Sequence, residues 1–214
     1  GTGNKHIMDI KKYLKTLFIK ACEEKSDINV HLPVLYKYAK KCSHITEFGA
    51  RGGLSTRTFL YSFPDFFVSY DYQYATPEPH LVEDVKNLIQ ILEHAQRKGV
   101  NCEYIGKDVL QIDIEPTDML FIDTWHCYNQ TKRELELHGH KVKKYIAFHD
   151  TVLFGTKGEG YPHNDPNHPE RDKLDGSGGI LKAINEFLKE NPEWSIDIEL
   201  KDPIGLMVIK KGRP

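Results

Sequence analysis

Hydrophobic and polar positions change their spacing several times along the 214-residue chain, which predicts helices that alternate with short buried strands. Near the start, apolar residues recur every three or four positions, as on one face of a helix. Further along, short apolar runs are each followed by a segment with helical spacing. The predicted helices are about 7–25, 31–41, 54–62, 80–98, 129–141 and 179–190, and the predicted strands are about 44–48, 66–70, 101–105, 118–122, 145–148, 194–200 and 205–210.

This alternation predicts an α/β fold, a Rossmann-like doubly wound sheet of seven strands with helices on both faces. The sheet should be mostly parallel with an antiparallel C-terminal strand, because only the short Asp202-Pro203 turn joins the last two strands. We expect a single domain over residues 1–214, with N-terminal helices in 1–43. Residues 152–177 carry Gly, Pro, Asn, Asp and His without a period, which predicts a substrate loop or lid.

Composition narrows the class of protein. Charged residues make up 28% and the hydrophobic set 39%, with a formal net charge of -2, which is typical of a globular protein. The lack of a basic run argues against a general nucleic-acid binder. No apolar run approaches a membrane span, and the scattered Cys22, Cys42, Cys102 and Cys127 form no CxxC pair. We therefore expect reduced thiols, a cytoplasmic location and no membrane partner.

The most informative motif is the turn Gly49-Ala50-Arg51-Gly52-Gly53, between a predicted strand and a predicted helix. Glycine allows positive φ and a close approach of the backbone to a ligand. The N-terminus of the following helix directs free N–H groups into the turn. Turns of this kind hold nucleotide-like cofactors at the carboxyl ends of strands, although a glycine turn also serves as a plain loop.

Acidic residues close the predicted strands in order. Glu47 lies near the end of the first strand, Asp71 follows the second, and Asp108 follows the third. A carboxylate about 20 residues after a glycine turn, as Asp71 is, accepts hydrogen bonds from ribose hydroxyls. Each acid alone could be an ordinary surface carboxylate, but the three in this order favour a bound adenosine.

Asp123 and Asp150 close the fourth and fifth strands, which should be neighbours in this topology. Two buried like charges need a cation or a shared proton, and oxygen-rich sites suit Mg²⁺. His149 is a third candidate ligand, and a satisfied core histidine is its alternative. His126, at the mouth of the cleft, could take a proton near neutral pH or be a hydrogen-bonded structural histidine.

The remaining histidines give weaker signals. His138 and His140 lie at a charged helix end, where we expect them to be solvated. His163 and His168 fall in the long loop, and no cysteine at zinc spacing accompanies them, which argues against a zinc site.

These segments resemble the class I S-adenosylmethionine-dependent methyltransferases, whose sheet of β/α units ends in an antiparallel hairpin. More narrowly, they resemble the group that joins macrocin-type, metal-dependent sugar O-methyltransferases with cephalosporin hydroxylase-like proteins (methyltransferase family 24 type). The resemblance covers about residues 26–212 and rests on the stretches 47–56, 119–135 and 148–151. Catechol O-methyltransferase is similar at a greater distance, with His126 at the place of its basic residue.

The resemblance implies S-adenosyl-L-methionine as cofactor and a divalent cation, Mg or Mn. It implies Asp123 and His126 as catalytic residues and Asp123, His149 and Asp150 as metal ligands. The cofactor-binding residues it implies are Glu47, Gly49, Ala50, Gly53, Ser55, Asp71, Tyr72, Asp108 and Asp123. The sequence departs from the group where Ala50-Arg51 replaces the usual second glycine. A second departure is His149, where related metal enzymes have a carboxylate or carboxamide, and it leaves Mn²⁺, Fe²⁺ or no metal open.

We therefore expect metal-assisted O-methylation of a small hydroxylated acceptor such as a sugar. The alternative is a non-catalytic cofactor-binding or partner subunit on the same fold. The antiparallel end and the missing GxGxxG argue against a nicotinamide-dependent oxidoreductase. The sequence leaves a homo-oligomer open.

Overall fold

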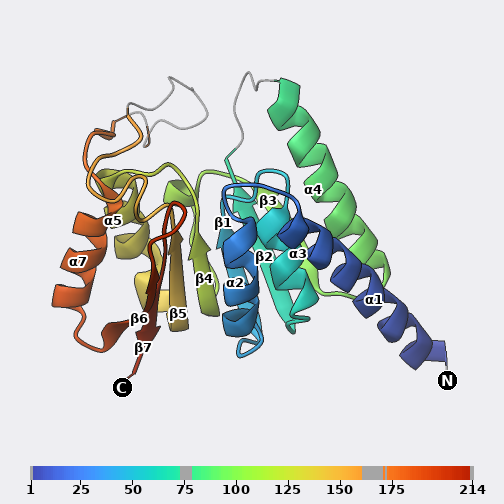
Figure 1. Ribbon diagram of the computed structural model, residues 1–214. Coiled ribbons are helices and arrows are strands. Elements are labelled where there is room, and N and C mark those ends of the chain that lie inside the picture. The colour runs from blue at the N-terminus through green and yellow to red at the C-terminus, as the bar shows by residue number, and fades with distance from the viewer. Residues whose placement is uncertain (1, 73–78, 161–170, 172, 213–214) are drawn as a thin grey trace.

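Seven strands form the centre of the computed structural model, which describes residues 2–72, 79–160, 171 and 173–212. The strands are β1 (His44–Phe48), β2 (Phe66–Asp71), β3 (Cys102–Gly106), β4 (Thr117–Ile122), β5 (Val142–His149), β6 (Trp194–Leu200) and β7 (Leu206–Lys211). They lie in the order β3-β2-β1-β4-β5-β7-β6 (Figure 1). Strands β1 to β5 are parallel, and β7 runs antiparallel to β5 and β6. This confirms the predicted fold class and topology.

The helices follow the predicted order as well. They are α1 (Thr2–Glu23), α2 (Leu32–Ala39), α3 (Leu54–Tyr61), α4 (Pro79–Arg97), α5 (Tyr128–His138) and α7 (Ile180–Glu190), with 3-10 turns η1 (Asn29–His31), η2 (Val109–Gln111) and η3 (Gly139–Lys141). Three predicted boundaries were wrong by three residues or more. Helix α1 starts at Thr2 rather than near residue 7, because its first turn is polar and carries no apolar spacing. Strand β5 starts at Val142 rather than at Tyr145, and the pattern missed this start because exposed Lys143 and Lys144 interrupt the apolar run. Helix α5 ends at His138, where η3 begins.

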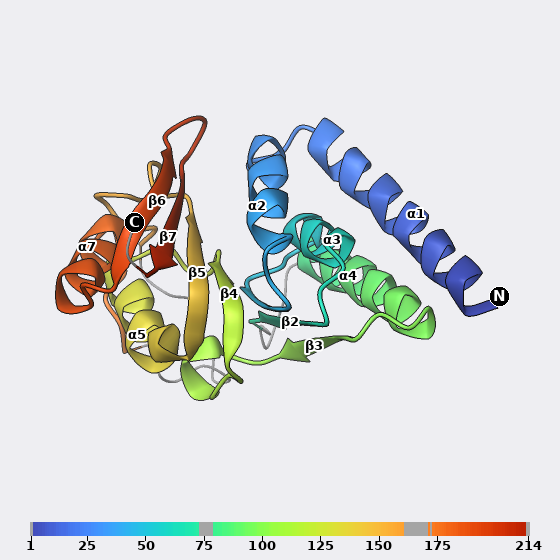
Figure 2. The same ribbon diagram turned by 90° about the horizontal axis from the view of Figure 1, so that it is seen from below.

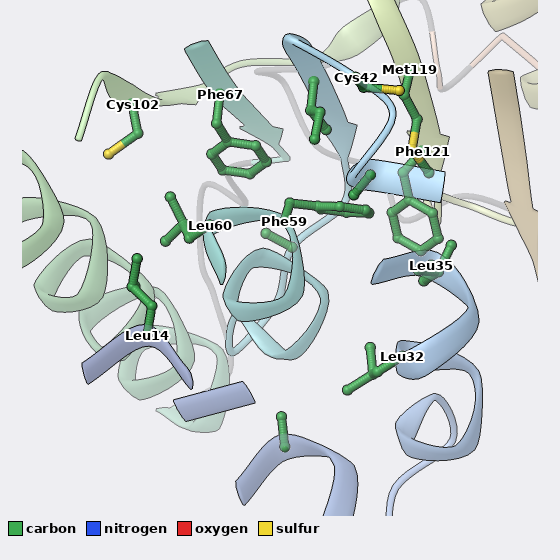
Figure 3. Packing of buried hydrophobic residues seen from close by; sticks show 14 of the residues in the cluster. Leu14, Leu32, Leu35, Cys42, Phe59, Leu60, Phe67, Cys102, Met119 and Phe121 are labelled. Carbon is green, nitrogen blue, oxygen red and sulfur yellow. The ribbon is translucent and has the colours of Figure 1, made fainter. Parts of the chain in front are cut away.

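The helices cover both faces of the sheet. Helices α1 to α4 lie on one face, and α5 and α7 lie on the other (Figure 2). Strand β4 shows how alternation divides the core, because Met119 and Phe121 pack toward the first face while Leu120 and Ile122 pack toward the second. On the first face, Phe59 of α3 lies between side chains of the sheet and of the N-terminal helices (Figure 3).

The N-terminal helix α1 packs on α3 through an apolar stripe. Ile10, Leu14 and Ala21 are buried, whereas Met8 and Ile19 on other sides of the helix are exposed. This pattern belongs to an amphipathic helix that covers a core. Within the described part of the chain, no helix combines the length and apolarity that crossing a bilayer requires.

The segment predicted as a substrate loop is described at its two ends. Backbone bonds pair these ends, with Gly158 N–H donating to Ser177 O (2.9 Å) and Gly160 N–H donating to Gly176 O (3.1 Å). The stem formed by residues 157–160 and 176–178 is also tied to the segment after β4, because Glu159 N–H donates to His126 O and Tyr128 N–H donates to Gly178 O. The predicted lid therefore starts from a fixed base, while its middle, with His163 and His168, lies outside the described residues.

Candidate functional site

The carboxyl ends of β1, β2, β4 and β5 meet at one edge of the sheet, as parallel strands require. The glycine turn after β1 contains three positive φ angles, 86° at Gly49, 44° at Arg51 and 87° at Gly53. A side chain at residue 49 would begin only 2.2 Å from the backbone oxygen of Asp123. Glycine is needed there because β4 ends directly against the turn, which brings Asp123 beside the predicted cofactor turn.

Asp71 fastens this turn. Its Oδ2 accepts the backbone N–H of Ala50 (3.2 Å) and Arg51 (2.9 Å), and its Oδ1 accepts that of Tyr72 (2.8 Å). Burial nevertheless raises the pKa of this carboxyl, although the three amide bonds oppose the rise. A carboxylate has about four acceptor positions, so Asp71 keeps room for a further donor such as a ribose hydroxyl.

Glu47 lies beneath the turn and is fully buried. Ser55 Oγ (2.6 Å), Thr56 Oγ1 (2.6 Å) and Ser69 Oγ (2.8 Å) donate to its carboxylate oxygens. Burial raises the pKa of Glu47 to about 7 despite these hydroxyls. Glu47 and Ser55 therefore brace the first turn of α3 from inside the protein. Any contribution of their side chains to cofactor binding would act through this bracing, because neither faces solvent.

Asp108 is also buried, and its Oδ1 accepts the N–H of Leu110 at 2.9 Å as the cap of η2. Tyr72, just after β2, and Trp125, just after β4, both contact the side chain of Arg171. The guanidinium carbon of Arg171, from the predicted loop, lies 4.3 Å from the Tyr72 ring centre and 5.1 Å from the Trp125 ring centre. Both rings thus contact a flat, delocalised cation.

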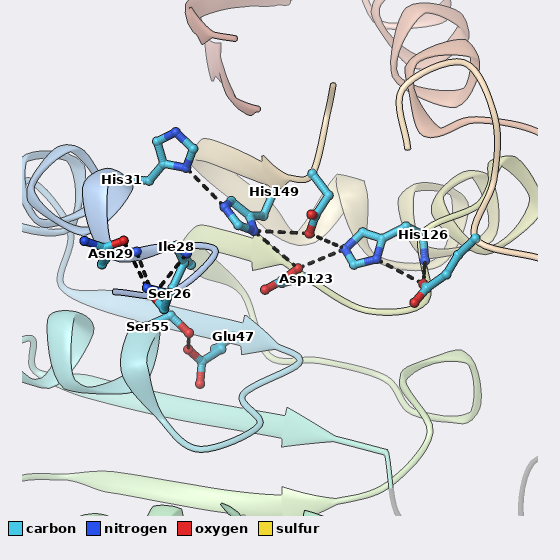
Figure 4. A network of polar contacts seen from close by, with 11 residues as sticks. Ser26, Ile28, Asn29, His31, Glu47, Ser55, Asp123, His126 and His149 are labelled. Atoms are coloured by element: carbon cyan, nitrogen blue, oxygen red, sulfur yellow. Dashed lines mark hydrogen bonds and ion pairs between the residues drawn. The ribbon is translucent and has the colours of Figure 1, made fainter. Parts of the chain in front are cut away.

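At the ends of β4 and β5, two carboxylates share one imidazole (Figure 4). His126 Nε2 lies 2.9 Å from Asp123 Oδ1 and 2.9 Å from Asp150 Oδ2, and its Nδ1 lies 3.1 Å from Glu159 Oε2. The ring of Phe154 stacks on the imidazole, with 5.1 Å between ring centres. Ligand atoms of Asp123, His126 and Asp150 all lie within 4.8 Å of one another, which is the spacing of a metal-binding group.

Asp150 has a φ of 61°, in the left-handed region that a residue with a side chain rarely adopts. The turn before β7 holds this conformation, since Asp150 N–H donates to Gly205 O (3.0 Å) and Val152 N–H donates to Ile204 O (2.8 Å). Backbone strain of this kind is common at functional sites. Here it accompanies a carboxyl group that faces His126.

His149, the last residue of β5, is buried next to the same carboxylates. Its Nδ1 lies 3.2 Å from Asp150 Oδ2 and 3.7 Å from Asp123 Oδ1. On its other side, Nε2 lies 3.1 Å from Nδ1 of His31, whose Nε2 contacts the backbone oxygen of Asp202 at 2.7 Å. His149, which was predicted as a metal ligand, therefore lies beside both carboxylates, and His31 of η1 joins the site from the N-terminal part of the chain.

In this cluster, the pKa of each carboxyl and of each imidazole depends strongly on the charge of its neighbours. Burial alone would raise the pKa of each carboxyl and lower the pKa of each imidazole. Hydrogen bonds with the imidazoles outweigh burial and hold the pKa of Asp123 and of Asp150 below their ordinary value. The carboxylates in turn raise the pKa of His126 well above its usual value and the pKa of His149 to about 9. Near neutral pH, the cluster therefore pairs charged imidazoles with charged carboxylates.

This charge state refines the prediction that His126 is a base. Both of its ring nitrogens face carboxylate oxygens, so the ring holds both protons in this geometry. It can accept a proton only after it gives one up.

The prediction that His138 is solvated was wrong, because this residue is buried. Its Nε2 contacts Val109 O at 2.7 Å, and its ring meets Phe48 edge-on.

Three residues of the site carried no readable signal in the sequence. His31, Glu159 and Arg171 reach it from segments far from the strands that they contact, and His31 is 118 residues away from His149. Glu159 reaches His126 because the backbone N–H of Glu159 in the loop stem donates to His126 O, and this tertiary contact leaves no pattern in the sequence.

Solved methyltransferase structures share this fold. The S-adenosylhomocysteine-bound methyltransferase PaMTH1 of Podospora anserina is 14% identical, with a TM-score of 0.57, over 97% of this chain and 88% of its own. The O-methyltransferase TomG of Streptomyces achromogenes, solved with S-adenosylmethionine, is 16% identical, with a TM-score of 0.57, over 92% of this chain and 90% of its own. An O-methyltransferase of Bacillus cereus, solved with S-adenosylhomocysteine, is 16% identical, with a TM-score of 0.57, over 94% and 90%.

At these identities, the likeness establishes the fold: the chain has the Rossmann-like fold of class I methyltransferases. No protein-family model matches the chain, and no curated protein matches it. The narrower resemblance to the macrocin-type group thus remains a prediction.

Proposed function

We propose that this protein is an S-adenosylmethionine-dependent methyltransferase that methylates an oxygen of a small hydroxylated acceptor, such as a sugar, with the help of a divalent cation. The observation that carries the proposal is the contact between the two halves of the site. The backbone of Asp123 fills the space above Gly49, so the turn fastened by Asp71 and the cluster of Asp123, His126 and Asp150 are immediate neighbours. A methyl donor over the turn would thus lie beside groups that handle protons and cations.

The rings of Tyr72 and Trp125, which share Arg171 as a neighbour, support the same cofactor. An adenine ring is flat and would stack between these rings where the guanidinium of Arg171 now lies. Asp71 has an acceptor position left for the ribose, and the glycine turn allows the amino acid part to approach the backbone. The neighbouring structures that hold S-adenosylmethionine or S-adenosylhomocysteine on this fold favour the same assignment.

The donor set around Asp123 fits a divalent cation. Oxygens of Asp123 and Asp150 lie within coordinating reach of one point, and Nδ1 of His149 faces the same carboxylates, while Nε2 of His126 is left for proton transfer. When bound, the cofactor would supply an electrophilic methyl group, and the cation would supply positive charge that lowers the pKa of an acceptor hydroxyl. Asp123 and Asp150 would hold the cation, and imidazole nitrogens make Mn²⁺ or Fe²⁺ better candidates than Mg²⁺.

The protein itself orients the groups and moves a proton. Phe154 and Glu159 fix the ring of His126, which keeps its Nε2 between the two carboxylates. If a bound cation compensated the charge of these carboxylates, Nε2 would release its proton to solvent, and the neutral ring could then take the hydroxyl proton of the acceptor. The acceptor would be aligned by the site rather than activated strongly, since a sulfonium is already a good leaving group.

A calorimetric and a turnover experiment test this function. Calorimetry should show S-adenosylhomocysteine binding, and radiolabelled S-adenosylmethionine should transfer its methyl group to a member of a panel of sugars and vicinal diols when Mn²⁺ is present. Failure to bind S-adenosylhomocysteine would overturn the proposal. Cofactor binding without any transfer or cation dependence would instead favour the alternative of a cofactor-binding or partner subunit. The cytoplasmic location and a homo-oligomer remain predictions.

A further inference from the structure

A line of hydrogen-bonding groups runs from the turn between β6 and β7 to the carboxylates of the site, and Figure 4 shows its part from His31 through His149 to Asp123. It begins at the backbone oxygen of Asp202, 2.7 Å from Nε2 of His31. It continues from Nδ1 of His31 to Nε2 of His149, 3.1 Å away, with the two rings edge-on at 78°. Both histidines are almost completely buried, at 2% and 1% exposure, so water does not compete for these contacts.

The carbonyl at the start of this line fixes the direction of each hydrogen bond. A carbonyl oxygen can only accept, so Nε2 of His31 must carry a proton. A second proton on His31 would place two cations against each other inside the protein, because His149 is in contact with it. Nδ1 of His31 is therefore a bare acceptor, and Nε2 of His149 is the donor that it accepts from.

The far nitrogen of His149 is left facing the carboxylates. Its Nδ1 lies 3.2 Å from Asp150 Oδ2 and 3.7 Å from Asp123 Oδ1. Neither contact has hydrogen-bond geometry, and this buried atom has no hydrogen-bond partner among the described residues. Without a cation, this nitrogen carries a proton whose charge faces the two carboxylates. A divalent cation bound beside the carboxylates would take the place of that proton, and Nδ1 would then offer it a lone pair.

We propose that His31 is a positioning residue for the cation site, because it accepts the Nε2 proton of His149 and so presents the Nδ1 lone pair of His149 to a metal ion held by Asp123 and Asp150. The inference rests on the cation in the proposed function and extends it to a residue of the N-terminal segment. Hydrogen bonds to the second nitrogen of a ligating histidine fix its tautomer and orientation, and their loss typically costs 10- to 100-fold in metal affinity. Imidazole ligation also predicts a preference for Mn²⁺, Fe²⁺, Co²⁺ or Zn²⁺ over Mg²⁺.

Two substitutions distinguish the roles of the two ring nitrogens of His31. His31→Asn can place an amide oxygen near the position of Nδ1 and so keep the acceptor for His149. His31→Gln can reach the Asp202 oxygen with its amide N–H but places no acceptor near Nδ1. The pair removes similar amounts of ring surface, which makes His31→Asn the matched control.

The test uses Co²⁺ as the probe, on the full chain without methyl donor or acceptor. Absorption titrations should show Co²⁺ bound by the wild-type protein and by His31→Asn with affinities within a few-fold, and bound about 10- to 100-fold more weakly by His31→Gln. In the Co²⁺-loaded wild-type protein, proton NMR should show a strongly shifted imidazole N–H signal that exchanges slowly with water, since His31 accepts this proton. The signal should persist in His31→Asn and be lost in His31→Gln.

Several results would overturn the inference. Equal weakening by both variants would mean that His31 only fills space, and unchanged binding by His31→Gln would mean that its acceptor has no role. A wild-type protein that binds Co²⁺ without the slowly exchanging signal would contradict it even if both variants failed to fold. If the wild-type protein binds no Co²⁺ but binds S-adenosylhomocysteine in calorimetry, the inference and the cation fail while the methyltransferase assignment stands.

Discussion

Two pairs of carboxylates end the central strands, and they are compensated in different ways. At β1 and β2, Glu47 and Asp71 are held by hydroxyl and backbone N–H donors. At β4 and β5, Asp123 and Asp150 face imidazoles. Hydroxyls and amides cannot leave, so the first pair is a permanent part of the turn. Imidazole protons can be exchanged for a cation, so the second pair can change its partner during a reaction.

The largest loss of turnover should come from removing a carboxylate of the second pair, Asp123 and Asp150, whose partners can be exchanged. Asp123→Ala removes one of the two oxygens that hold His126 and the proposed cation, and we expect a loss of turnover of about a thousandfold or more, comparable to the loss of a main electrostatic group. S-adenosylhomocysteine affinity should change little, because the turn is held by Asp71. Methyl-transfer assays and calorimetry measure both quantities, and the exposed Asp113→Ala serves as control. Normal turnover in Asp123→Ala would remove the cation and the proton transfer from the proposed function.

The pH dependence of the free energy of unfolding tests the role of Glu47 in the first pair. Its pKa is about 7 in the folded protein against an ordinary value of 4.5, so between these values only the unfolded chain releases the proton. The wild-type free energy of unfolding should therefore fall as pH rises from about 4.5 to about 7, and this term should level off above that range, with a total change of at most about 3 kcal/mol. Glu47→Gln should lack this slope in urea unfolding, whereas Glu103→Gln, at an exposed position on β3, should keep it. Parallel curves for Glu47→Gln and the wild-type protein would show that Glu47 is charged inside the fold.

Breaking the permanent pair should act on the cofactor. Asp71→Ala leaves the N–H groups of Ala50 and Arg51 without their acceptor, so the turn should loosen. Hydrogen bonds to a charged group contribute about 1.5–3 kcal/mol, and we expect S-adenosylhomocysteine to bind about 10- to 100-fold more weakly. Co²⁺ binding should stay within a few-fold of the wild-type value, which is the opposite of Asp123→Ala. Asp65→Ala, at an exposed position just before β2, is the control. If Asp71→Ala weakened the binding of S-adenosylhomocysteine and of Co²⁺ equally, the division into two regions would be contradicted.

The smallest change in cofactor affinity should come from Arg171, which contacts the rings of Tyr72 and Trp125. Arg171→Ala removes the guanidinium that lies between Tyr72 and Trp125, so an entering adenine would displace nothing. Cation–π contacts of this kind are worth about 0.5–2 kcal/mol, and S-adenosylhomocysteine should bind about threefold to tenfold more tightly. Arg171→Lys keeps a cation and should lie between the two. Weaker or unchanged cofactor binding in Arg171→Ala would place the adenine elsewhere.

The sequence predicted the fold well because local patterns carried it. The apolar runs of the strands, the turn around Gly49 and the antiparallel end are each readable within a few residues, and the carboxyl ends of parallel strands must share one edge. This rule also brought Asp123 and Asp150 together correctly. The partners of these acids were harder to predict. His31 and Arg171 arrive through tertiary packing, and whether Glu47 faces a ligand or the protein interior depends on three hydroxyls of α3 and β2.

The absence of a side chain at Gly49 has a consequence for redesign. The oxygen of Asp123 would lie only 2.2 Å from a β-carbon at residue 49, so backbone atoms alone set the spacing between the glycine turn and the cluster around Asp123. Even alanine would force the first and fourth strands apart and move the reacting groups out of alignment. New substrates should therefore be sought by changing the loop stem and its contacts, while the junction between these two strands is left untouched.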